Sequence, residues 1–460
     1  MNESTSISDY LQPGRRAHLV GIGGVSMCAL GQVLHNMGME ITGSDMQASS
    51  ATQLLIETGI PVVIGHRAEN LGRAECVIRS AAIHDDNPEI AAARAAGIPV
   101  FERAQSWGEL MRSYPNAVCV SGAHGKTTTT SMLTHIYMEA GRDPTVMIGG
   151  TLPLLGAGHR VGNGDTILME SCEYCNSFHN FYPTLAIILN VDADHLDFFG
   201  NLDNVKASFR HFAELVPQDR GTVLVCGENE NAMDCLKGIQ RRVLTFGFDE
   251  SFDYYAKDFS QDWRRFDVYG PEGLYCHVEL QVIGRHNAMN ALAAAAASDI
   301  QGLEGQWVTK ALADFTGAGR RMEYKGSYHG AVIYDDYAHH PNEVQATLSA
   351  VRALGYERVI CAFQPHTYSR TKALFDDFAQ VLTLPDVTLL APIYAAREQD
   401  IYGVSSRNLA EAVPGAECFD SFPDLQARLQ DLARPGDIIL TVGAGDIYKI
   451  GEALAALNEG

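Results

Sequence analysis

A glycine-rich turn followed by lysine and threonine is the clearest chemical signal in the sequence. The turn reads Gly-Ala-His-Gly-Lys-Thr over residues 122–127, and it follows the apolar run Ala117–Val120. Glycines let backbone N–H groups approach phosphate oxygens, lysine neutralises β- and γ-phosphates, and a threonine hydroxyl at a helix start binds Mg²⁺. The turn is shorter than the common phosphate loop, and a plain glycine turn is the alternative. The order strand, turn, helix favours an ATP site formed by Gly122, His124, Gly125, Lys126, Thr127 and Thr128.

Acidic and imidazole side chains follow two further strand-like runs and could hold the metal ion of a phosphate loop. The run Thr166–Met169 leads into Glu170, and the run Leu185–Val191 leads into a stretch with His195. Because the carboxyl ends of parallel strands meet at one sheet edge, we expect Thr127, Glu170 and His195 to lie close together. Glutamate suits Mg²⁺, whereas histidine is a less usual ligand and points to a second ion. A solvated loop is the favoured interpretation of three neighbouring acids, Asp192, Asp194 and Asp197.

A second glycine turn, Gly-Ile-Gly-Gly over residues 21–24, lies near the start of the chain. It joins a strand-like run, residues 17–20, to a helical run, and the next strand-like run ends at Ser44 and Asp45. In such a βαβ unit the glycines approach a pyrophosphate and the acid holds a ribose hydroxyl. Ser26 stands where the dinucleotide fingerprint has its third glycine, which weakens an NAD interpretation. The turn alone leaves a dinucleotide, a nucleotide-sugar and a structural role open.

These turns must be positioned by stacked α/β units, because strand-like and helical runs alternate along the whole chain. A length of 460 residues fits about three domains. We predict an α/β protein with a Rossmann-like domain over residues 1–113, a central phosphate-loop ATPase-like domain with a mainly parallel sheet over 114–322, and a Rossmann-like domain over 323–460. In the third segment, the pattern predicts a first strand near Ala331, later strands at Arg358–Phe363 and Asp437–Val442, and a helix over 370–382.

The composition excludes several classes of protein. With 34 Lys+Arg against 56 Asp+Glu, the net charge of −22 argues against nucleic-acid binding. No apolar run approaches the roughly 20 residues of a membrane-spanning helix, and the polar start lacks a secretory signal, so we expect a cytoplasmic protein with no membrane insertion. The ten cysteines are scattered and read as reduced thiols. Cys172-Glu-Tyr-Cys175 is a lone C-x-x-C without the further ligands of a zinc site.

Strings along almost the full chain, taken together with these motifs, resemble the Mur ligase family. They occur in the family's order: HLVGIGGVSM (18–27), GSD (43–45), SGAHGKTTTT (121–130), ESCEYCNSF (170–178), NVDADHLDFFG (190–200), GRHNAMNALAA (284–294), FTGAGRRMEY (315–324), DDYAHHPNEV (335–344) and FQPHTYSRT (363–371). The resemblance implies an ATP-dependent ligase of peptidoglycan precursor synthesis. The lactyl carboxylate of UDP-N-acetylmuramate would be activated as an acyl phosphate, and the amine of L-alanine would then displace phosphate.

The resemblance also implies roles for residues at matching positions. Lys126 and Thr127 would hold the phosphates and a first Mg²⁺, Glu170 would bridge two ions, and His195 would bind the second. Asn287 and Asn290 match adenine-reading positions, Arg320 or Arg321 the arginine that reaches the phosphates, and Asp336 the ribose-binding acid. The incoming amino acid and the reacting groups would be gathered by His339, His366 and Arg370. The UDP-sugar would be held by Gly21, Gly23, Gly24, Val25, Ser44, Asp45 and Ser80.

A few positions depart from the family pattern. Ala81 replaces the second serine of the usual SSAI string, and Thr367 stands where many relatives have arginine. No lysine occupies the place where some sister ligases carry a carbamylated one, since Phe209 and Arg210 lie there. Within the family, the Gly-Ile-Gly-Gly turn and the FQPHTYSR string (363–370) favour L-alanine as the acceptor, and a relative that adds another amino acid or a preformed peptide is the alternative. The family resemblance leaves the oligomeric state open, for which a monomer or weak homodimer is expected.

Two rival functions fit the sequence less well. A nicotinamide oxidoreductase built on the first glycine turn leaves Lys126, Glu170 and His195 unexplained. A noncatalytic nucleotide-binding protein predicts that these three residues are lost, yet all three are present.

Overall fold

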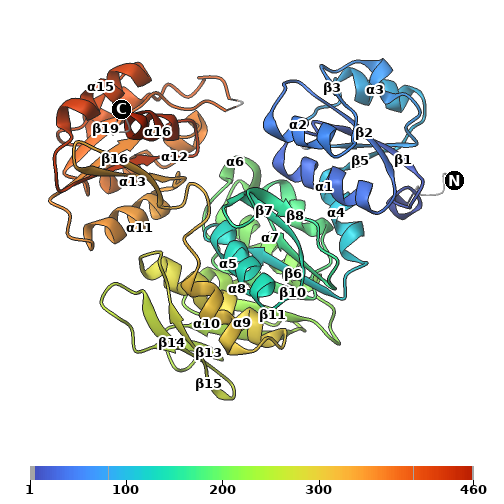
Figure 1. Ribbon diagram of the computed structural model, residues 1–460, viewed down its shortest axis with the longest axis horizontal. Helices are drawn as coiled ribbons and strands as arrows, with labels where there is room; N and C mark the ends of the chain where they lie inside the picture. The colour runs from blue at the N-terminus through green and yellow to red at the C-terminus, as the bar shows by residue number, and fades with distance from the viewer. Residues whose placement is uncertain (1–5, 81, 397, 458–460) are drawn as a thin grey trace. The chain divides into compact units, whose positions relative to one another are not determined.

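The computed structural model describes residues 6–80, 82–396 and 398–457 (Figure 1). The chain divides into two compact units. The first comprises Met1–Ala256, Val268–Cys276 and Asn290–Ala311, and the second Lys257–Asp267, His277–Met289 and Leu312–Gly460. Among the helices in the described ranges, none combines the length and the apolar character needed to cross a membrane.

The N-terminal part of the first unit is a parallel sheet with strand order β3-β2-β1-β4-β5. Its elements are η1 (Ile7–Asp9), β1 (Arg16–Val20), α1 (Val25–Asn36), β2 (Glu40–Asp45), α2 (Ser50–Glu57), β3 (Val62–Ile64), η2 (Ala68–Leu71), β4 (Cys76–Arg79), α3 (Pro88–Ala95), β5 (Val100–Glu102) and α4 (Arg103–Met111). The order reverses between β1 and β4. A parallel sheet opens a crevice at such a point, beyond the carboxyl ends of the strands.

A larger, ten-stranded sheet follows, with order β15-β14-β13-β12-β11-β10-β6-β9-β7-β8. The neighbouring pairs from β13 to β8 are parallel except β7 with β8. The strands are β6 (Asn116–Ser121), β7 (Thr145–Leu152), β8 (Ala157–Arg160), β9 (Thr166–Glu170), β10 (Leu185–Ile188), β11 (Thr222–Cys226), β12 (Arg242–Gly247) and β13 (Tyr254–Lys257). Because β6 lies between β9 and β10, the loops that follow these three strands leave the sheet side by side.

This part of the chain also contains its helices and the remaining two strands of the sheet. They are α5 (Lys126–Glu139), η3 (Tyr174–Asn180), α6 (Leu196–Phe199), α7 (Leu202–Glu214), α8 (Glu230–Cys235), β14 (Arg265–Gly270), β15 (Gly273–Glu279), α9 (Arg285–Ile300) and α10 (Gly305–Ala313). Strand β6 is apolar and fully buried along Ala117–Val120, which is why its sequence lacks the alternation of a half-exposed strand.

The C-terminal part lies in the second unit and has a sheet with order β16-β17-β21-β18-β19-β20. Its pairs are parallel apart from β16 with β17. The elements are β16 (Glu323–Tyr328), β17 (Ala331–Asp336), α11 (Pro341–Arg352), β18 (Arg358–Phe363), α12 (Tyr368–Ala373), α13 (Phe375–Val381), β19 (Val387–Leu390), α14 (Ser406–Ala412), β20 (Glu417–Cys418), α15 (Phe422–Leu432), β21 (Asp437–Val442) and α16 (Tyr448–Ala456).

The predicted α/β class with mainly parallel sheets is confirmed, and two local predictions need correction. The helix expected over 370–382 is two helices, α12 and α13, separated at Leu374, whose backbone lies at φ −114° and ψ 27°. The first strand of the third segment is β16, before the expected start near Ala331. Its polar sequence EYKGSY, at the sheet edge, carries no apolar alternation. The strands at 358–363 and 437–442 are found as predicted.

Candidate active site

The glycine turn after β6 has a backbone that only glycine fits well. Gly125 caps the start of α5 with φ +87°, and a Cβ placed there would lie 2.5 Å from Asn290 Oδ1. Gly122 has φ +143°. Asn190 fixes the middle of the turn, since its Oδ1 accepts a hydrogen bond from His124 N at 2.8 Å and its Nδ2 donates to His124 O at 3.0 Å. The predicted adenine-reading residue Asn290 therefore packs directly against the phosphate loop.

Lys126 is the first residue of α5, and its ammonium is held by the turn and by one carboxylate. Nζ donates to Gly122 O and, at 3.1 Å, to Ala123 O. It also lies 3.0 and 3.2 Å from the two carboxylate oxygens of Glu173. Burial, the largest single effect, lowers the pKa of Lys126, but the charge and hydrogen bond of Glu173 and the other negative groups nearby together outweigh burial and raise this pKa above its usual value. The lysine is therefore a largely buried cation at the centre of the turn, with 13% of its side chain exposed.

Thr127 and Glu170 meet beside this lysine, as the strand order predicts. The Thr127 hydroxyl donates to Glu170 Oε1 at 3.0 Å, and Gly149 N donates to Glu170 Oε2 at 2.6 Å. A Cβ at Gly149 would lie 2.5 Å from the same carboxylate, so this close approach requires glycine. A hydroxyl and a carboxylate at a helix start are the oxygen ligands that Mg²⁺ prefers, so the residues fit such an ion. Thr128, also predicted at this site, is buried in the first turn of α5.

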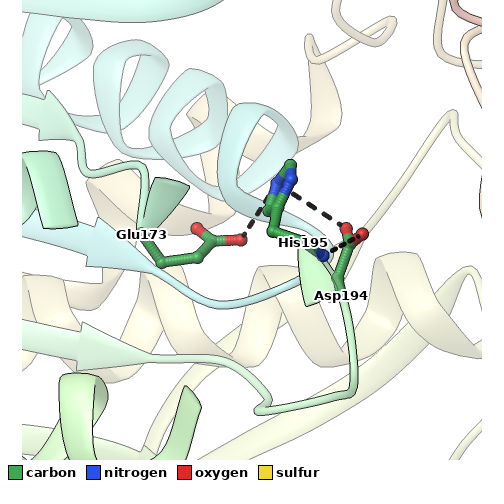
Figure 2. Close-up of side chains that lie close together, drawn as sticks. All are labelled: Glu173, Asp194 and His195. Carbon is green, nitrogen blue, oxygen red and sulfur yellow. Dashed lines mark hydrogen bonds and ion pairs between the residues drawn. The ribbon is translucent and has the colours of Figure 1, made fainter. Parts of the chain in front are cut away.

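His195 lies in the loop after β10, in the left-handed region at φ 53° and ψ 37°. Its Nε2 is 3.8 Å from Glu173 Oε1 and 3.8 Å from Asp194 Oδ2 (Figure 2). The Asp194 carboxylate also accepts a hydrogen bond from His195 N at 2.7 Å. The ligand atoms of these three residues all lie within 4.8 Å of one another, a grouping that could hold a cation. No direct contact joins Glu170 to His195 within the described residues.

Two members of this cluster were not predicted from the sequence. Glu173 is buried and contacts both Lys126 and His195. It lies within the C-x-x-C string, where the cysteines drew attention to zinc and redox chemistry; both are free thiols. Asp194, assigned to a solvated loop, is only 8% exposed. The available signal was spacing, because Glu173 follows the strand-end acid Glu170 by three residues and so stays near the same sheet edge.

The first glycine turn is closed by the end of β2. Gly21 N and Ile22 N donate to Ser44 O at 2.8 and 3.0 Å, and Gly23 N donates to Asp45 Oδ2 at 2.8 Å. Ser80 follows β4 on the other side, and a Cβ at Gly21 would lie 3.2 Å from its hydroxyl. The structure thus places Gly21 between the end of β2 and Ser80, at the crevice between β1 and β4. Gly24 caps α1, and Val25 is half exposed.

Ser44 faces the interior instead of this crevice. Its hydroxyl is fully buried and donates to Glu89 Oε2 at 2.6 Å. Glu89 also contacts Asn70 Nδ2 and, at 3.2 Å, His66 Nδ1. Ser44 therefore supports the turn through its carbonyl and anchors β2 through its hydroxyl. Ala81, the departure noted next to Ser80, lies outside the described residues.

In the second unit, the predicted ribose-binding acid and arginine are both held by local contacts. Asp336 accepts hydrogen bonds from Ala338 N at 2.8 Å and Met322 N at 2.9 Å, and burial raises its pKa to about 6. Arg320 donates to Asp335 Oδ2 at 2.8 Å and to the carbonyls of Gly443 and Gly445. Through these contacts, Arg320 links the end of β17 to the loop after β21 and stabilises its unit.

The alternative arginine and the second adenine-reading residue have fewer local partners. Arg321 has one long ion pair, 3.8 Å from Glu343. Asn287 is buried, and its Nδ2 donates to Ile283 O at 2.8 Å.

The three residues predicted to gather the amino acid lie together in the second unit. Arg370 Nη1 is 3.2 Å from His366 Nδ1, and the His366 and His339 rings are 5.7 Å apart. Glu398, which the sequence analysis did not single out, accepts hydrogen bonds from the backbone and hydroxyl of Ser369, the former at 2.8 Å. This contact fixes the start of α12 and so the base of Arg370.

Models of three Mur ligase domains match the chain in order. The model described as "Mur ligase family, catalytic domain" matches residues 16–115, "Mur ligase middle domain" matches 120–298, and "Mur ligase, glutamate ligase domain" matches 320–445. Together they cover most of the chain.

Curated relatives and solved structures agree with these models. A UDP-N-acetylmuramate–L-alanine ligase of Caldanaerobacter subterraneus is 42% identical over 98% of this chain and 99% of the relative. One of Agathobacter rectalis is 43% identical over 95% and 97%. Among solved structures, a UDP-N-acetylmuramate–alanine ligase of Thermotoga maritima matches with a TM-score of 0.80 and 27% identity over 96% of this chain and 99% of its own.

A murein peptide ligase of Psychrobacter arcticus matches with a TM-score of 0.73 and 25% identity, over 96% of this chain and 98% of its own. The α/β fold in three domains, the phosphate loop with its strand-end acids and the extent of these matches lead to one conclusion. The chain belongs to the Mur ligase family.

Proposed function

We propose that the chain uses ATP to join L-alanine to the lactyl carboxylate of UDP-N-acetylmuramate in peptidoglycan precursor synthesis. The observation that carries the proposal is the arrangement after β6 and β9, where the largely buried ammonium of Lys126 lies near the hydrogen bond from Thr127 to Glu170. Phosphoryl transfer needs charge neutralisation and positioning more than covalent help from the protein, and this arrangement provides both. The names of the curated relatives support the choice of sugar and amino acid.

The first chemical step activates the carboxylate, which is a poor electrophile. A lactyl carboxylate oxygen attacks the γ-phosphorus of ATP, the bond to the β-phosphate oxygen breaks, and ADP and an acyl phosphate result. Lys126 neutralises charge on the β- and γ-phosphates, while backbone N–H groups of the turn at residues 122–125 bind phosphate oxygens. Thr127 and Glu170 would hold Mg²⁺, which would supply further positive charge to the phosphates.

The second step forms the amide. The neutral amine of L-alanine attacks the acyl carbon to give a tetrahedral intermediate. The intermediate expels inorganic phosphate, which leaves with the oxygen that came from the carboxylate, and the proton lost by the amine balances the charge of the phosphate. We assign the alanine carboxylate to Arg370, because a guanidinium binds a carboxylate through two parallel hydrogen bonds. His339 and His366 complete this group, and the contact between Arg370 and His366 supports the assignment.

Nucleotide and sugar contacts follow the same logic. We assign adenine to Asn287 and Asn290 and the ribose of ATP to Asp336. An arginine contact with the phosphates is assigned to Arg321 in preference to Arg320, because each side-chain nitrogen of Arg320 already donates a hydrogen bond within its unit. UDP is assigned to the turn at Gly21–Val25 with Asp45 and Ser80, and Ser44 is assigned a supporting part.

The proposal extends to the ions and to the organisation of the chain. We assign a second Mg²⁺ to His195, with Glu173 and Asp194 as neighbouring carboxylates, because these ligand atoms lie within 4.8 Å of one another. Domain boundaries near residues 113 and 322, and a monomer or weak homodimer, complete the proposal.

A related ligase that adds another amino acid or a recycled peptide is the second candidate. The structural similarity to a murein peptide ligase supports this second candidate. One methyl or hydroxyl group changes binding by only about 1–3 kcal/mol in a small pocket, so selectivity must be measured.

Phosphate release separates the candidates. The protein is incubated with ATP, Mg²⁺ and UDP-N-acetylmuramate, and L-alanine, glycine, L-serine and a tripeptide are supplied in turn. The proposal expects the fastest release with L-alanine. Phosphate release with the tripeptide alone would show that the protein is a ligase of recycled peptides. No phosphate release with any acceptor would exclude a ligase activity on this sugar.

A further inference from the structure

Glu173 combines three properties that its assignment beside a second ion does not explain by itself. Its side chain is 3% exposed, both of its carboxylate oxygens contact Lys126 Nζ, and one lies 3.8 Å from His195 Nε2. A buried carboxylate is costly unless it is paired, so in the nucleotide-free protein Glu173 depends on Lys126 for compensation. Figure 2 shows its carboxylate directed toward His195 and Asp194.

Lys126 is also the group that the phosphates of a bound nucleotide need. A phosphate that pairs with the ammonium of Lys126 weakens the pairing of that ammonium with Glu173. The phosphate also brings further negative charge close to Glu170, Glu173 and Asp194. Without another cation, the Glu173 carboxylate would then be buried and only partly compensated. A divalent cation that arrives with the nucleotide can restore the balance, because Glu173 lies between the lysine and the cluster around His195.

We propose that Glu173 is a positioning residue that couples nucleotide binding to a divalent cation: it holds Lys126 in the nucleotide-free protein and makes phosphate binding at Lys126 unfavourable unless the cation binds too. This inference rests on the proposed function for the identity of the ligand. It assigns Glu173 no contact with the reacting atoms. The raised pKa of Lys126, to which Glu173 contributes, agrees with a strong pairing of the two charges.

The experiment measures the dissociation constant of ADP by calorimetry, in EDTA and in excess Mg²⁺, for the full chain. ADP serves as the probe because it cannot turn over. The Mg²⁺ effect is the ratio of the two dissociation constants. Glu173→Gln keeps the shape of the side chain and removes its charge, so metal-free ADP should bind more tightly and the Mg²⁺ effect should fall by about tenfold, within the range of typical couplings.

Two further variants distinguish coupling from damage to the fold. Glu173→Asp retains the charge and should keep most of the Mg²⁺ effect. Glu139→Gln removes a charge at the far end of α5, where Glu139 pairs with Lys310, and should leave the effect unchanged. The thermal unfolding midpoint of each variant checks that the fold is intact.

An unchanged Mg²⁺ effect in folded Glu173→Gln overturns the inference, and so does equal ADP binding by the wild type with and without Mg²⁺. Neither result contradicts the proposed function, whose test is the formation of a product with L-alanine. Conversely, a coupled nucleotide site in a protein that forms no such product would sustain the inference and contradict the function.

Discussion

Thr127 and Glu170 are 43 residues apart in the chain, yet the Thr127 hydroxyl donates a 3.0 Å hydrogen bond to Glu170 Oε1. The contact exists because β6 and β9 are neighbouring parallel strands whose carboxyl ends lie side by side. It places a hydroxyl and a carboxylate next to Lys126, the group that meets the phosphates.

Removing either oxygen ligand should impair phosphoryl transfer. Thr127→Val keeps the size of the side chain but removes the hydroxyl, and we expect phosphate release to fall roughly 100-fold or more. Thr127→Ser retains the hydroxyl and should stay within about tenfold of the wild type. Equal activity of the valine and wild-type proteins in saturating ATP and Mg²⁺ would show that the hydroxyl is not used.

Gly125 and Gly141 lie at the two ends of α5, and alanine variants at these positions distinguish the effect of backbone strain from that of steric conflict. Both have positive φ, +87° and +66°, but a Cβ at Gly125 would meet Asn290 Oδ1 at 2.5 Å, whereas one at Gly141 has open space. Either alanine variant should lose about 1–2 kcal/mol of stability from the left-handed backbone. Only Gly125→Ala should also lose nucleotide affinity, as measured by ADP titration. Comparable ADP affinity in the two variants would contradict the role of the turn.

Arg370 should determine affinity for the amino acid. Arg370→Lys keeps the charge but loses the planar fork, so we expect the KM for L-alanine to rise roughly 10- to 100-fold, the loss of one charged hydrogen bond. The KM for ATP should change little, and initial rates at varied alanine and ATP measure both. A rise confined to the KM for ATP would contradict the assignment of Arg370 to the amino-acid site.

Glu89 should make stability depend on pH. Burial alone raises its pKa, but contacts with His18, Ser44 and Asn70 outweigh burial and lower the pKa from 4.5 to about 2. A carboxyl group with a lowered native pKa stabilises the fold above its unfolded-state pKa, and this contribution is lost as the pH falls toward the native value. Glu89→Gln should therefore cost about 3 kcal/mol near neutral pH.

The cost of that substitution should shrink below pH 4.5, where the unfolded chain begins to bind the proton. Unfolding in urea at several pH values gives the difference between the variant and the wild type. A difference that stays constant from neutral to acidic pH would mean that the charge of Glu89 is not what anchors Ser44 and β2.

The sequence was informative wherever a residue follows a strand. Parallel strands bring their carboxyl ends to one edge, so the proximity of Thr127 and Glu170 could be predicted without coordinates. The position of Ser80 near Gly21 was implied by the family resemblance and not by this argument. Strand β16 was not predicted because it is a polar edge strand. The break between α12 and α13 was not predicted because nothing in the sequence at Leu374 interrupts the helical pattern.

Side-chain partners across long separations could not be predicted. Arg320 uses its donors on Asp335, Gly443 and Gly445, the last 125 residues away in the chain. Glu173 pairs with Lys126 through a loop that follows β9, and its position in that loop depends on packing instead of periodicity. Its spacing from Glu170 keeps Glu173 near the same sheet edge, but the pairing with Lys126 depends on how the loops fold against one another, which spacing does not determine.

Isotope transfer tests the central claim, that a carboxylate is activated by phosphorylation before the amide forms. UDP-N-acetylmuramate with oxygen-18 in its lactyl carboxylate is incubated with the protein, ATP, Mg²⁺ and L-alanine. The account predicts one oxygen-18 in each released phosphate, and the other in the amide carbonyl of a UDP-muramoyl-alanine product identified by mass. Unlabelled phosphate, or labelled phosphate without the alanine product, would contradict it.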